Sequence, residues 1–120
     1  MSEHYTQTDQ HIWQLDAVRV LDLILRVEVK NPQGLPPLAW RLPGGRELIG
    51  EPTTGTDREK AEAVRAWARS LHGRATARDL GHGVQRLTFT GPFANAGVDM
   101  VTITITTTVD AAEAGAGGDR

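Results

Sequence analysis

The sequence predicts an α+β fold, with two helices packed on one face of an antiparallel sheet of four to five strands. Two segments, 12–30 and 61–71, repeat apolar residues every three or four positions, as one face of a helix does. Two others, 38–51 and 85–109, contain runs in which apolar and polar residues alternate, as in strands. Along the chain, these segments give the order α-β-β-α-(β)-β-β.

The first helix is expected over residues 12–30. Its apolar positions are Ile12, Leu15, Val18, Leu21, Leu25 and Val29. Charged residues follow the same spacing on another face and can pair along the helix, Asp16 with Arg19 and Asp22 with Arg26. The end of this segment is rich in β-branched residues and alternates strictly, so a short strand over 24–30 is the alternative.

A hairpin is expected next. Leu38, Trp40 and Leu42 alternate on one face ahead of the turn sequence Pro43-Gly44-Gly45, and residues 46–51 return. 

The second helix begins with a capping box. The Thr56 hydroxyl and the Glu59 carboxylate are each expected to accept a hydrogen bond from the other residue's backbone amide. We expect Gly73 to end this helix. The stripe that faces the core is formed by Ala61, Val64, Trp67, Ala68 and Leu71.

The last third of the chain is expected to form strands. Residues 74–78 predict a short strand, 85–90 a clearer one and 98–109 the longest. In the longest, Val101 and Ile103 begin a row of apolar residues that alternates with threonines. The apolar face should therefore pack on the helices, while the threonine face contacts water.

Residues 11–109 are expected to form a single domain, with a flexible N-terminus at 1–10 and a disordered tail at 110–120. The chain has no cysteine, which excludes disulfides, iron–sulfur clusters and thiolate zinc sites. No apolar run has the length of a membrane span, and the start lacks the basic and apolar regions of a secretory signal. We therefore expect a cytoplasmic protein with no membrane partner.

No pattern identifies catalytic residues, a metal site or a cofactor. The histidines show no metal-ligand spacing. Asp79 and His82, close together in a glycine-rich turn, are the one candidate dyad for a small enzyme or ligand-binding domain. A polar turn is the simpler interpretation, and the sequence favours a protein that is not an enzyme.

Four arginines form a candidate contact for an anion or a nucleic acid. Residues 57–86 carry seven cations and four anions, a net charge of +3, although the whole chain has a formal charge of -2. An ordinary solvated helix face is the alternative. The arginines are Arg65, Arg69, Arg74 and Arg78.

The first helix carries more apolar surface than one small sheet can cover. Excess apolar surface is typical of an interface. We therefore expect an interface with a second copy of the chain, or with another protein, at Val20, Leu23, Ile24 and Val27.

Three apolar stretches of the sequence are Leu35-Pro36-Pro37-Leu38-Ala39-Trp40, Leu48-Ile49-Gly50 and Val64-Arg65-Ala66-Trp67. In these stretches the sequence resembles a group of small actinobacterial proteins found in Streptomyces-like genomes and mobile elements. The resemblance spans residues 12–107 and implies a bacterial source with a GC-rich genome. It implies no catalytic residues, because its motifs are apolar and structural.

Three functions remain open. The first is an intracellular interaction module that forms a homodimer. The second is a nucleic-acid-binding accessory or regulatory protein of a bacterial chromosome or mobile element. The third is a small ligand-binding domain or enzyme built around Asp79 and His82.

Overall fold

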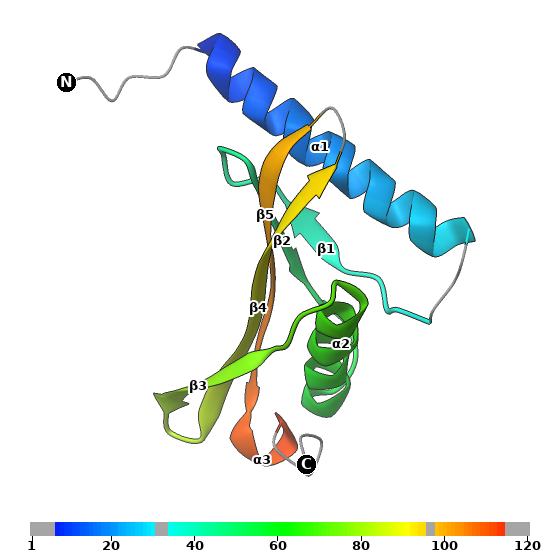
Figure 1. Ribbon diagram of the computed structural model, residues 1–120. Helices are drawn as coiled ribbons and strands as arrows, with labels where there is room; N and C mark the ends of the chain where they lie inside the picture. Colours follow the sequence, from blue (N-terminus) through cyan, green and yellow to red (C-terminus); the bar gives the residue numbers. More distant parts are fainter. Residues whose placement is uncertain (1–6, 31–33, 96–97, 115–120) are drawn as a thin grey trace, which may run out of the picture.

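The computed structural model describes residues 7–30, 34–95 and 98–114 of the chain and confirms the α+β fold class and the predicted order of elements (Figure 1). The elements are α1 (Gln7–Lys30), β1 (Ala39–Arg41), β2 (Glu47–Glu51), α2 (Asp57–Ser70), β3 (Thr76–Gly81), β4 (Val84–Asn95), β5 (Val98–Asp110) and α3 (Ala111–Ala114).

The strands form one sheet in the order β1-β2-β5-β4-β3. Its neighbouring strands run antiparallel except β2 and β5, which are parallel, with Leu48 opposite Ile103. The sheet is therefore mixed, where the sequence predicted antiparallel pairing throughout. The physical reason is the connection: α2 and the β3–β4 hairpin lie between β2 and β5, and a long crossover of this kind allows parallel pairing.

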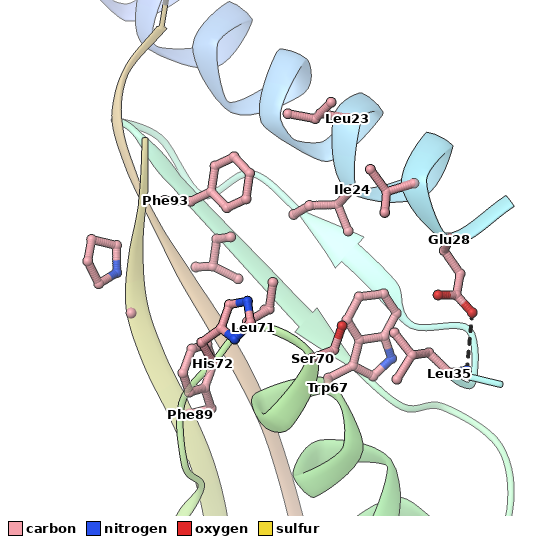
Figure 2. Close-up of a pocket in the computed structure, with 14 residues that line it drawn as sticks. Leu23, Ile24, Glu28, Leu35, Trp67, Ser70, Leu71, His72, Phe89 and Phe93 are labelled. Carbon is pink, nitrogen blue, oxygen red and sulfur yellow. Dashed lines mark hydrogen bonds between the residues drawn. The ribbon is translucent and has the colours of Figure 1, made fainter. Parts of the chain in front are cut away.

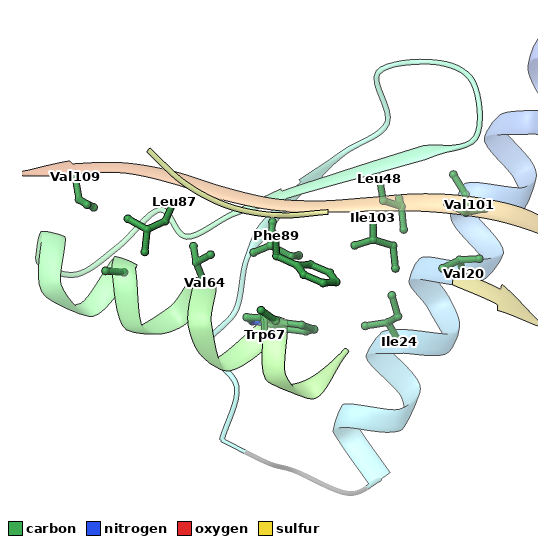
Figure 3. Packing of buried hydrophobic residues seen from close by; sticks show 14 residues of the cluster. Val20, Ile24, Leu48, Val64, Trp67, Leu87, Phe89, Val101, Ile103 and Val109 are labelled. Carbon is green, nitrogen blue, oxygen red and sulfur yellow. The ribbon is translucent and has the colours of Figure 1, made fainter. Parts of the chain in front are cut away.

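Helices α1 and α2 pack on the same face of the sheet and enclose the core (Figure 3). Val20 and Ile24 of α1 and Val64 and Trp67 of α2 point toward the strands. The strands contribute Leu48, Leu87, Phe89, Val101, Ile103, Ile105 and Val109.

The other face of the sheet carries the threonine row, as predicted. The row continues onto the neighbouring strand, because the hydroxyls of Thr88 and Thr106 lie 3.0 Å apart and those of Thr90 and Thr104 lie 3.3 Å apart. Cross-strand pairs of this kind stabilise a sheet by a few tenths of a kcal/mol to about 1 kcal/mol each.

Helix α1 continues to Lys30, so residues 24–30 are helical and the alternative of a strand is wrong. The turn between β1 and β2 holds this helix on the sheet. Arg46 pairs with Asp16 at 2.9 Å and lies 5.8 Å from the centre of the Trp13 ring. Asp16 is therefore paired with the hairpin and not with Arg19 as predicted, because its side chain faces inward and is buried.

The exposed pair between Asp22 and Arg26 is confirmed, with a distance of 2.8 Å. An exposed pair of this spacing contributes only about 0.3–0.5 kcal/mol.

Helix α2 begins at the predicted capping box, in which the Glu59 amide donates to Thr56 Oγ1 at 3.1 Å and the Thr56 amide donates to Glu59 Oε1 at 2.8 Å. Trp67 is 3% exposed, and its indole N–H donates to the Pro36 carbonyl at 2.8 Å. The Trp40 ring packs edge-on against it, with centroids 5.7 Å apart. Through Pro36, the segment before β1 is hydrogen-bonded to α2. Through Trp40, the β1–β2 hairpin packs against the same helix.

Helices α1 and α3 extend into the two ends that the sequence predicted as flexible. Helix α1 already begins at Gln7, and α3 continues from β5 to Ala114. Asp57 joins the C-terminal end of β5 to the start of α2, since its carboxylate accepts a hydrogen bond from the Asp110 amide at 2.8 Å. The remaining parts of the two predicted flexible ends lie outside the described residues.

None of the helices within residues 7–30, 34–95 and 98–114 combines the length and the apolar character needed to cross a membrane.

Candidate functional site

The four residues predicted as an interface lie in two different environments. Val20 and Ile24 are 1% and 8% exposed and belong to the core, so they are not available to a partner. Leu23 and Val27 are more open and line a cleft between α1 and α2. This arc of α1 therefore serves the protein's own interior, because it faces the sheet.

A second apolar row lies on the outer face of α1. Leu15, Val18, Leu25 and Val29 are between 43% and 79% exposed, and Asp22 lies among them. These five positions are spaced three and four residues apart in alternation, which is the spacing of a coiled-coil seam. The helix thus has one apolar arc for the sheet and another that the described residues leave uncovered.

The cleft beside the inner arc has a volume of about 510 Å³ (Figure 2). Leu23, Ile24 and Val27 line it from α1, while Trp67 and Leu71 line it from the end of α2. Phe89, Phe93 and Ile103 of the sheet also contribute to its wall. It exists because α1 and α2 both lie on the sheet but leave its surface uncovered between them.

Three polar residues border this cleft. Glu28 accepts a hydrogen bond from the Leu35 amide at 3.2 Å, and Ser70 and His72 lie at the end of α2 (Figure 2). Glu28 is the only Asp, Glu, Lys or Arg among the described residues that line the cleft. Its lining therefore combines a mostly apolar wall with one negative charge.

The end of α2 differs from the sequence prediction. His72, with φ of 63°, takes the left-handed conformation that glycine usually supplies, while Gly73 follows it and donates from its amide to the Ala68 carbonyl at 2.8 Å. Gly73 is needed for a different reason, because a Cβ there would overlap the Phe89 ring. The sequence could not reveal this, since it depends on a contact with a strand far along the chain.

Three of the four predicted arginines are brought together. Arg65, Arg69 and Arg74 line one hollow of about 620 Å³ at the end of α2, although Arg65 also pairs with Glu62 at 3.6 Å. Arg78 lies elsewhere, because its neighbour Ala77 pairs with the buried Leu87 and the alternation of β3 places Arg78 on the opposite face of the sheet.

Asp79 and His82 do not form a catalytic arrangement. The Asp79 carboxylate accepts a hydrogen bond from the Gly81 amide at 2.8 Å, and His82 is exposed at the tip of the β3–β4 turn with φ of 56°. Neither residue lines the cleft between α1 and α2 or the hollow that Arg65, Arg69 and Arg74 line. The geometry gives no support to an enzyme or a ligand site at this turn.

Across the residues that the structure describes, no three His, Asp or Glu side chains are grouped closely enough to hold a metal ion. Comparisons of the chain with family models, with curated proteins and with solved structures give no match.

Proposed function

We propose that the protein is an interaction module that forms a homodimer through the outer face of α1. The observation that carries this proposal is the exposed row of Leu15, Val18, Leu25 and Val29 on a helix whose opposite face is already packed on the sheet. A seam with this spacing is the surface through which two helices interlock their side chains.

Charge favours an antiparallel arrangement of the two α1 helices. In the register that packs Leu15 of each copy against Leu25 of the other, Asp22 of each copy lies beside Arg19 of the other. Arg19 is exposed and forms no ion pair with another described residue. A two-fold axis between residues 18 and 22 then makes both ion pairs at once.

The experiment is analytical ultracentrifugation over a range of protein concentrations. We expect the unchanged protein to dimerise and Leu25→Lys to raise the dimer dissociation constant by at least about tenfold, because it places two charges in the apolar seam. Val27→Lys is the matched control: Val27 is 49% exposed on the same helix, but it lies on the inner arc, so the dimer should persist.

A charge exchange tests the register. Asp22→Arg and Arg19→Asp should each weaken the dimer, and the double variant should restore it, because the ion pairs are re-formed with their signs reversed. A protein that stays monomeric at every concentration, or a dimer that Leu25→Lys leaves unchanged, contradicts the proposal.

A second candidate function is binding of a polyanion such as nucleic acid at the arginine hollow. It is supported by the convergence of Arg65, Arg69 and Arg74 on one hollow. We expect salt-sensitive binding of a short oligonucleotide, and Arg69→Ala or Arg74→Ala should lower the slope of log K against log salt by about one unit each.

Arg78→Ala is the control for the arginine hollow, because Arg78 lies on the opposite face of the sheet. No binding at low salt, or an equal loss with Arg78→Ala, removes this candidate.

A further inference from the structure

The cleft between α1 and α2 has the size and the lining of a small-molecule site. Its volume of about 510 Å³ falls within the roughly 300–1,000 Å³ that is typical of ligand pockets. Trp67, Phe89 and Phe93 contribute three aromatic rings, and leucine and isoleucine side chains cover much of the rest. A flat ring or an alkyl chain can therefore be removed from water on several sides.

The floor of the cleft is rigid at Phe89. A Cβ on Gly73 would overlap this ring, and a Cβ on Gly91 would lie 2.8 Å from its Cζ atom. The two glycines thus allow the backbone to approach the ring closely at two points, which limits the space in which the ring can move. A preformed wall of this kind lowers the entropic cost of binding.

His72 lines the same cleft directly after α2. Its left-handed conformation ends the helix, because the His72 amide donates to the Arg69 carbonyl and the Gly73 amide donates to the Ala68 carbonyl. This hydrogen-bonded turn sets the course of the chain along the edge of the cleft into Gly73.

The charge of the lining selects the ligand. Glu28 lies at one edge of the cleft, and the described lining includes neither Lys nor Arg. A carboxylate or phosphate ligand would be repelled by Glu28, whereas an ammonium group would be attracted.

We propose that this cleft binds a small, mainly apolar molecule that carries a positively charged amine, with the apolar part between Trp67, Phe89 and Phe93 and the amine beside Glu28. The proposal is independent of the dimer, because the cleft lies on the inner arc of α1 and the seam lies on the outer arc.

The probe is N-phenyl-1-naphthylamine, a neutral aromatic amine whose fluorescence rises in an apolar site. We expect saturable binding with a dissociation constant on the order of 10–100 µM. Val27→Trp should weaken it at least about tenfold, because the larger ring fills the cleft from a half-exposed position. Ile12→Trp, which adds the same ring at a position 46% exposed and outside the cleft, should leave binding unchanged.

Displacement of the bound probe by charged amphiphiles tests which ligand charge the cleft prefers. Dodecyltrimethylammonium, used below the concentration at which it forms micelles, should displace the probe more strongly than dodecanoate. Glu28→Gln should reduce this preference about fivefold and leave binding of the neutral probe unaltered. The Leu25→Lys variant should bind the probe as the unchanged protein does, which separates this site from the dimer seam.

Two outcomes overturn the proposal. Absence of saturable fluorescence, or a Val27→Trp variant that binds as well as the unchanged protein, removes the site. Equal displacement by dodecanoate and dodecyltrimethylammonium, with no effect of Glu28→Gln, removes the assignment of a cationic ligand.

Discussion

Single glycines decide how closely the end of α2 approaches the sheet. Gly73 follows the left-handed His72 and lies against the Phe89 ring, with which a side chain of any size would collide. Conformational freedom is not the reason for this glycine, because the left-handed residue is His72. Its role is to leave space, and that role links the helix end to the wall of the cleft.

Gly73→Ala should therefore destabilise the protein by about 1–3 kcal/mol, because the added methyl group forces the Phe89 ring or the helix end to move. Urea unfolding measures the change. In a Phe89→Leu background, where the ring is absent, the same substitution should cost clearly less. An equal cost in both backgrounds would show that the collision with the ring is not the cause.

At the scale of the elements, α1 shows what a sequence can and cannot specify. Its period of three to four residues predicts a helix, and the structure confirms it to Lys30 in spite of the β-branched residues. The same period cannot say which arc faces the sheet, because apolar residues occur on both. Val20 and Ile24 were therefore assigned to an interface, although they lie in the core.

In the strands, too, local features could be predicted from the sequence, whereas features that depend on distant parts of the chain could not. Alternation predicted the faces of β5 correctly, since each side chain's direction follows from the backbone pleat. The parallel pairing of Glu47–Glu51 with β5 was missed, because it joins segments about fifty residues apart and depends on the crossover between them. Of the four arginines predicted to form one anion contact, Arg65, Arg69 and Arg74 share a hollow, whereas Arg78 lies on the opposite face of the sheet because of the strand register.

At the scale of the molecule, the candidate surfaces lie in separate places. The seam is on the outer face of α1, the cleft is between α1 and α2, and the arginine hollow is lined by α2, the chain that follows it, β3 and Leu87 of β4. A dimer formed through α1 leaves the cleft and the hollow to other ligands. Variants that change one surface can therefore be designed without removing a side chain from another.

Dimerisation through the seam also predicts how the stability of the whole molecule depends on its concentration. If folding is coupled to association, the midpoint of thermal unfolding, Tm, should rise by several degrees when the protein concentration is increased a hundredfold, because association stabilises the folded state by mass action. The Tm of Leu25→Lys should not change with concentration, while Val27→Lys should follow the unchanged protein. Calorimetry at several concentrations measures this, and a Tm of the unchanged protein that is independent of concentration would contradict it.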